Sequence, residues 1–98
     1  MVDESDVDDA PHRLSLRFAY DTARRARTVE RSVRVEVGEI DDARSAARVD
    51  RVRSDGSSAH DTVRVRIGAA DLVALRAGAN TWRRLLSVAE SVASAANR

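Results

Sequence analysis

The feature that most constrains the fold is an apolar stripe in the last third of this 98-residue chain. Apolar residues recur there at steps of three and four, which is the spacing of one face of an α-helix. They are Leu72, Leu75, Ala79, Trp82, Leu86, Ala89, Ala93 and Ala96. Gly68 is expected to cap this helix, and Asp71 sits in its first turn, where the helix dipole favours an acid. Leu85, Val88 and Val92 widen the stripe, so the helix has more apolar surface than one sheet face needs.

Two segments alternate between apolar and polar residues, as half-buried strands do. RLSLRFAY (13–20) places Leu14, Leu16, Phe18 and Tyr20 on one face, and DTVRVRI (61–67) does the same with Val63, Val65 and Ile67. SAARVDRV (45–52) predicts a weaker strand, and the turn signal SDGSS (54–58) joins it to the third strand as a hairpin.

A shorter helix is predicted between the first two strands. Asp21 is a good N-cap for a helix that begins at Thr22 and ends near residue 36. A modest apolar stripe at spacings of three and four supports it: Ala23, Ala26, Val29, Val33 and Val37. Val33, Val35 and Val37 also alternate with polar residues, as in a strand, so the residue at which this helix ends is not fixed by the pattern. GEIDDAR (38–44) is a connection.

The order of elements is therefore β-α-β-β-α, which predicts an α+β domain with two helices on one face of an antiparallel three-stranded sheet. One domain spans residues 12–98, and the acidic segment MVDESDVDDAP (1–11) is expected to be a disordered tail. The absence of cysteine excludes disulfides and thiolate metal sites. No apolar run is long enough to cross a membrane, so a cytoplasmic protein is expected.

The core on offer is thin. Alanine contributes 17 residues and valine 13, while Phe18, Tyr20 and Trp82 are the only aromatic residues. A domain this small buries about 60–65% of its unfolded surface, so further burial against another chain is expected. Because exposed strand edges need covering, pairing of two copies into a continuous six-stranded sheet is favoured.

The charge is unevenly distributed. The first ten residues hold five acids and no base, whereas the rest of the chain has 17 basic and 11 acidic residues, a difference of +6. Every basic residue is arginine. Strand alternation places five of them on the sheet face that the helices leave open, with Asp50 as the nearby acid, and this face can bind phosphates of RNA. They are Arg13, Arg17, Arg48, Arg64 and Arg66. An arginine-rich genome that decorates every exposed face is the alternative.

The stretch RAGANTWRR (76–84) interrupts the last helix with Gly78 and Asn80, both unfavourable in helices. Glycine allows another backbone to approach closely, and a mid-helix asparagine is explained if its amide reaches a partner. The stretch is therefore interpreted as an interface with a second chain. The alternative is a tolerated glycine on a solvated face.

No catalytic constellation is found in the sequence. His12 and His60 are the only histidines, and no metal-ligand spacing, carboxylate pair or glycine-rich phosphate loop accompanies them. We therefore expect no enzyme activity, metal or cofactor.

At RAGANTWRR the chain resembles the small dimerising subunit of the KEOPS (EKC) complex, of the polarised-growth chromatin-controller family related to the cancer/testis antigens, in its archaeal type. The resemblance rests on Ala74-Leu75-Arg76, Asn80-Thr81 and Arg84, with Asp71 near the helix start and Arg44-Ser45 before the second strand. It covers about residues 12–95. Arg83, where an apolar residue is common, and the longer hairpin depart from the pattern.

The resemblance implies a non-catalytic subunit that dimerises, with itself or with a second small subunit, and that binds the threonylcarbamoyl transferase of the complex, in company with its kinase and other subunits. That complex forms threonylcarbamoyladenosine next to the anticodon of tRNA, so tRNA is an expected partner. The candidate transferase surface on the last helix is Arg76, Asn80, Thr81, Arg83, Arg84 and Ser87.

Two other readings stay open. A free-standing RNA-binding α+β module, KH-like in outline, would use a Gly-x-x-Gly loop and surface aromatics that this chain lacks. A small enzyme on the same layers has few titratable candidates to work with.

Overall fold

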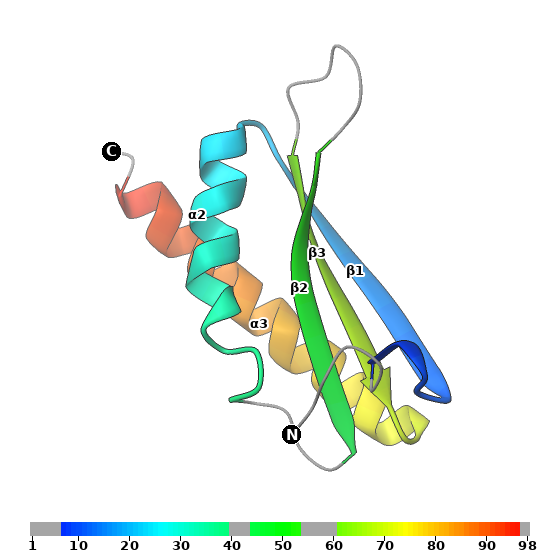
Figure 1. Cartoon of the computed structure of the whole chain (residues 1–98). Coiled ribbons are helices and arrows are strands. Elements are labelled where there is room, and N and C mark those ends of the chain that lie inside the picture. Colours follow the sequence, from blue (N-terminus) through cyan, green and yellow to red (C-terminus); the bar gives the residue numbers. More distant parts are fainter. Residues whose placement is uncertain (1–6, 40–43, 54–60, 97–98) are drawn as a thin grey trace.

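The computed structural model describes residues 7–39, 44–53 and 61–96. Three strands form one sheet: β1 (His12–Tyr20), β2 (Ser45–Arg53) and β3 (Asp61–Ala69). Two helices, α2 (Ala23–Arg34) and α3 (Leu72–Ala96), both lie on one side of it (Figure 1). The predicted order β-α-β-β-α, the antiparallel sheet and the placement of both helices on one face are confirmed. The predicted hairpin turn at 54–58 lies outside the described residues.

The sheet has the order β1-β3-β2, and both neighbours run antiparallel to β3. The central strand β3 supplies the most buried positions, because Val63, Val65 and Ile67 face the helices. The segment 45–52, expected to be a weak strand, pairs along its whole length with β3, from Ser45 opposite Ala69 to Arg53 opposite Asp61. Pairing with a strongly apolar neighbour therefore compensates for its small side chains.

Helix α2 begins one residue later than predicted. Thr22, not Asp21, is the N-cap: its backbone is extended and its hydroxyl accepts a hydrogen bond of 3.0 Å from the Arg25 amide. Ala26, Val29 and Val33 are buried, whereas Val35 is exposed in the turn after the helix ends at Arg34. Val33 therefore belongs to the helix, as its spacing from Val29 predicted, and the alternation of Val33, Val35 and Val37 does not form a strand.

Helix α3 is capped by Asp71 rather than by Gly68. The Asp71 carboxylate accepts a hydrogen bond of 2.8 Å from the Ala74 amide, and its other oxygen pairs with Arg44. The Ala70 amide also donates to the Arg44 carbonyl at 2.8 Å. These contacts join the start of β2 to the start of α3. Gly68 was predicted to cap the helix, and this is wrong because the residue belongs to β3.

The glycine inside α3 serves packing within this chain. A Cβ built on Gly78 would lie 3.2 Å from Ile67 Cγ2, so the missing side chain lets α3 lie close to β3. The prediction that Gly78 marks an approach by a second chain is therefore wrong. Trp82, one turn further on, is only 2% exposed and belongs to the core. Leu72, the first residue of α3 and of the predicted stripe, is exposed rather than buried.

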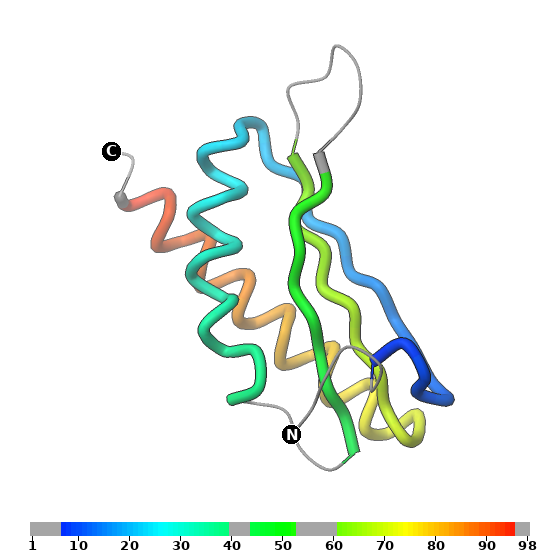
Figure 2. Tube along the Cα trace, in the orientation of Figure 1, coloured from blue at the N-terminus to red at the C-terminus, as the bar shows by residue number. Residues whose placement is uncertain are grey.

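Residues 7–11 differ from the disordered tail expected over residues 1–11. They form a short turn that doubles back against the end of the sheet where β1 begins (Figure 2). Val7 is 2% exposed. Within the described part of the chain, neither helix is long and apolar enough to cross a membrane.

Candidate interaction surfaces

The outer face of the sheet, which the helices leave uncovered, carries the five predicted arginines. Strand register places Arg17 opposite Arg64, and Arg66 opposite Arg48. Arg13 lies opposite Gly68, one row nearer the end of the sheet. The structure therefore brings Arg13, Arg17, Arg48, Arg64 and Arg66 together as one surface, called here the arginine face. Like charges directly opposite each other on neighbouring strands destabilise a sheet unless anions compensate.

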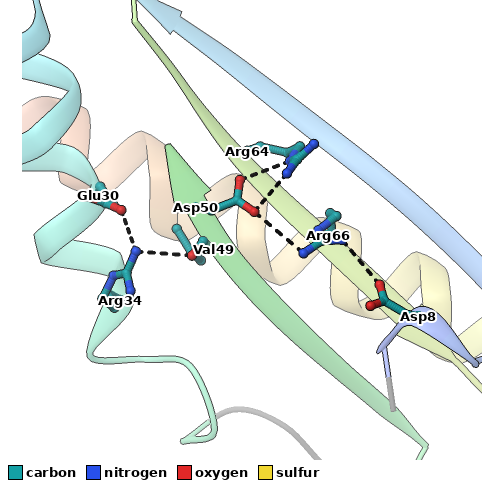
Figure 3. Close-up of polar contacts among 7 residues, drawn as sticks. All are labelled: Asp8, Glu30, Arg34, Val49, Asp50, Arg64 and Arg66. Carbon is teal, nitrogen blue, oxygen red and sulfur yellow. Dashed lines mark hydrogen bonds and ion pairs between the residues drawn. The ribbon is translucent and has the colours of Figure 1, made fainter. Parts of the chain in front are cut away.

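One internal anion is Asp50, which lies opposite Arg64 in the register (Figure 3). Arg64 donates two hydrogen bonds to its carboxylate, Nε to Oδ1 at 3.0 Å and Nη2 to Oδ2 at 2.9 Å. Arg66 Nη2 lies 3.6 Å from the same Oδ2. Partial burial by itself would raise the pKa of Asp50, but the hydrogen bonds from Arg64 and the charges of Arg64, Arg66 and Arg48 outweigh it and lower that pKa. Asp50 therefore stays ionised.

A second anion, Asp8, comes from the segment before β1. Its Oδ1 lies 3.2 Å from Arg66 Nη1, and its backbone carbonyl accepts a hydrogen bond of 2.8 Å from Arg13 Nη1. Within the described part of the chain, Asp50 and Asp8 pair with Arg64 and Arg66. A surface on which five arginines gather is suited to a polyanion. This contact was not predicted, because the acidic segment was assigned as a tail.

The second surface is the exposed side of α3. Arg76, Asn80, Thr81, Arg83, Arg84 and Ser87 are all exposed, as the sequence predicted for a partner surface. At 100° per residue they do not form one narrow stripe, because Thr81 projects a quarter turn or more from Asn80 and Arg76. The Thr81 hydroxyl donates to the Ala77 carbonyl at 3.0 Å, so it is engaged within its own helix.

Beside the polar residues, α3 carries an apolar flank made of Leu85, Val88 and Val92. Val88 is 62% exposed and Val92 57%, whereas Leu85 packs partly against the core. Helix α2 contacts the opposite side of α3, where Arg25 Nη2 donates to the Ser94 hydroxyl at 2.6 Å. The flank therefore points away from α2, and neither the sheet nor α2 covers it. Uncovered valines in line on one helix are typical of an interaction site.

The two edges of the sheet also differ. Arg34, at the end of α2, approaches β2 from the side opposite to β3 and donates to the Val49 carbonyl at 3.3 Å (Figure 3). Glu30 accepts another hydrogen bond from Arg34 at 2.5 Å and holds it in place. A side chain that occupies a strand-edge carbonyl interferes with pairing of another strand there.

Fold and surfaces define a small α+β domain whose sheet presents arginines and whose last helix is only partly covered. The chain matches the protein family described as Transcription factor Pcc1 over residues 13–94. It therefore belongs to the Pcc1 family, the family of the small KEOPS (EKC) subunit. Curated proteins and solved structures gave no match to this chain.

The match includes the residues on which the resemblance was based. Arg44 and Asp71 pair with each other and fix the start of α3, so they have a structural role. Arg76, Asn80 and Arg84 are exposed, and their side chains form no hydrogen bond or ion pair with the other described residues. The sequence did not identify Val7, Asp8 or Gly68 as parts of the outer face. Gly68 in a strand was the available signal, because a strand glycine often marks a close backbone approach.

Proposed function

We propose that this chain is a non-catalytic scaffold subunit of KEOPS that binds and bridges threonylcarbamoyl transferase subunits and so supports threonylcarbamoyladenosine formation in cytoplasmic tRNA. Family membership supports the complex. The observation that carries the role of this chain is the exposed side of α3, where polar residues and the apolar flank adjoin without a partner among the described residues. A helix of this kind fits between the helices of another protein.

The transferase surface combines two parts of α3. Val88 and Val92 supply apolar area, and Asn80, Arg84 and Ser87 supply hydrogen-bond donors and acceptors beside it. Interfaces of this composition have an apolar centre and a polar rim. The arginines also favour an acidic partner helix.

Two copies pair, in this proposal, through β1. The sheet has two edge strands, β1 and β2. The edge of β1 is favoured because Arg34 already donates a hydrogen bond to a carbonyl on the edge of β2. Leu14 and Phe18 of β1 are only partly buried against the core, so a partner strand beside them adds burial to a thin domain. A second small subunit with a matching edge strand is the alternative partner.

The arginine face is the proposed tRNA contact. The arrangement of its five arginines in opposed rows suits a phosphate backbone. The alternative function, a free-standing RNA-binding module, uses the same face but needs no transferase.

The test of the scaffold is co-purification of the tagged chain with the transferase subunit. The double variant Asn80→Ala, Arg84→Glu is expected to lower recovery of the transferase at least about tenfold, the effect of losing a central charged contact. Arg27→Glu, an equal charge change at an exposed position of α2, is the matched control and should retain it. Equal recovery with all three proteins would contradict the assignment of α3.

The test of the RNA contact is binding of unmodified tRNA transcript by the chain alone and with the transferase. Arg17→Glu should weaken binding and flatten its salt dependence, whereas Arg27→Glu should change it little. Tight binding by the chain alone, together with failure to retain the transferase, would favour the free-standing module.

A further inference from the structure

The segment Val7–Ala10 lies directly on the outer face at Gly68. A Cβ built on Gly68 would lie 2.7 Å from the Val7 carbonyl oxygen and 2.8 Å from the Ala10 Cβ. These distances are shorter than side chains tolerate, so the segment can rest there only because residue 68 has no side chain. Val7 is buried and anchors the segment.

The segment places its own anion on the arginine face. The Asp8 carboxylate pairs with Arg66 and is about half exposed, at 51% of its side chain. Arg13 donates to the carbonyl of the same residue. Between the segment and the sheet is an open pocket of about 350 Å³, lined in part by Arg13, Ser15 and Arg66. The buried Nε atom of Arg66 has no hydrogen-bond partner among the described residues.

A half-exposed ion pair of this kind contributes little to stability, about 0–1 kcal/mol, so another anion can replace Asp8 at small cost. Val7 would stay buried during that exchange, because its contact with the sheet does not depend on the carboxylate. A phosphodiester offers Arg66 the same two-oxygen acceptor that Asp8 offers, and it also satisfies Arg13 and Ser15 around the pocket.

We propose that residues 7–10 form an intramolecular anionic strap in which Asp8 competes with a backbone phosphate of RNA for Arg66, so that RNA binding at the pocket displaces the carboxylate. The inference rests on the proposed tRNA contact of the arginine face. It assigns the pocket beside Arg13, Ser15 and Arg66 as a phosphate subsite of that face.

The experiment measures the affinity of the full chain for an unmodified tRNA transcript by fluorescence polarisation over a series of salt concentrations. Asp8→Asn is expected to tighten binding about threefold to tenfold, because the competing state is removed. The slope of log K against log salt should stay close to that of wild type, because the same phosphate contacts Arg66 in both complexes once Asp8 has been displaced. Asp9→Asn is the matched control: Asp9 is exposed, makes no ion pair in the described part of the chain, and loses the same charge. It should change the affinity less than about twofold, since an exposed charge without a partner acts only through screened, longer-range fields.

Gly68→Ala provides a second, uncharged variant. The added Cβ must displace the strap, so this variant should also bind the transcript more tightly although its net charge is unchanged. Equal affinities for wild type, Asp8→Asn and Asp9→Asn would overturn the strap while leaving the tRNA contact intact. No binding by any of these proteins would overturn the tRNA contact itself, and the strap with it.

Discussion

The two faces of the sheet are made by the same strands and yet depend on different forces. On the inner face Val63, Val65 and Ile67 are almost fully buried beneath two helices. On the outer face Arg64 and Arg66, the residues between them, are held by ion pairs with Asp50 and Asp8. Apolar burial is worth about 25 cal/mol per Å², whereas partly exposed ion pairs contribute little. The inner face therefore sets stability, and the outer face can be altered with little loss of it.

The inner face changes character at the end where β2 finishes and β3 begins. Arg51 and Asp61 face inward there, with Arg51 Nε 3.4 Å from Asp61 Oδ2. The nearby Tyr20 hydroxyl donates to Glu90 at 2.8 Å and links β1 to α3. The comparison is thus between a largely apolar face with one polar end and a charged face against which Val7 is buried.

The largest effect is expected from removing the centre of the inner face. Trp82→Ala leaves a cavity beneath α3 and should destabilise the chain by about 3–5 kcal/mol, a large part of the stability of a small domain. Urea unfolding followed by far-ultraviolet circular dichroism measures it. The neighbouring exposed Arg83→Ala should stay within about 0.5 kcal/mol of wild type. Similar losses in both variants would show that the two positions do not differ in burial.

A smaller effect is expected from closing the gap between α3 and β3. Gly78→Leu forces a side chain against Ile67 and should destabilise by about 1–3 kcal/mol despite the better helix propensity of leucine. Ala77→Leu, one residue earlier on the exposed side, is the control and should be neutral or stabilising. Thermal unfolding of the two variants measures the difference. Equal unfolding midpoints would contradict the close approach of α3 to β3 at Gly78.

The polar end of the inner face is expected to weaken in alkali. Burial, the hydrogen bond to Glu90 and the charge of Glu90 raise the pKa of Tyr20 well above its ordinary value of 10.0. The unfolded chain therefore ionises first, and stability should fall as pH rises above about 10. Absorbance of Tyr20, the only tyrosine, should show no phenolate until the chain unfolds.

Tyr20→Phe is the control for this behaviour. It should cost about 1 kcal/mol at neutral pH, the net value of one hydrogen bond, and should lack the part of the alkaline loss that comes from the phenol. Ionisation of Tyr20 near pH 10 in the folded protein would contradict the buried hydrogen bond.

The smallest effect is expected on the outer face. Asp50→Asn should destabilise by less than about 1 kcal/mol, since its ion pairs are partly exposed. Because the folded-state pKa of Asp50 is lowered, its contribution is present above the ordinary value of 3.8 and is lost as pH falls through the lower folded value. Wild type should therefore lose more stability than Asp50→Asn in acid unfolding between pH 5 and 2. Parallel curves would contradict the pairing.

Most of the inner face could be predicted from the sequence. Alternation in β1 and β3 is typical of a strand, and the spacing by three and four in α3 is typical of a helix, so each pattern indicates which residues face the core. The outward direction of the five arginines followed from the same alternation. The cap at Thr22 was missed by one residue, since Asp21 and Thr22 are both good caps and only the backbone decides between them. The role of Gly78 was misassigned, because a glycine indicates close approach without indicating which chain approaches.

The contact of residues 7–10 with the sheet could not be predicted from local patterns. The acidic, proline-terminated segment 1–11 has the composition of a tail, and its two valines, Val2 and Val7, carry no periodicity. The contact exists because Gly68 lies on the outer face beneath the segment. To predict it, one would need to know the register of β3 with β1.

The hydrogen bond from Arg34 to Val49 also limits how large an assembly can grow. A sheet with two open edges can add copies head to tail without end, as fibres do, whereas a sheet with one usable edge can pair only with the same edge of another copy. Because Arg34 occupies an edge carbonyl of β2, the pairing proposed above through β1 would be isologous and would close after two chains. One arginine on the short helix thus favours a finite particle over a polymer.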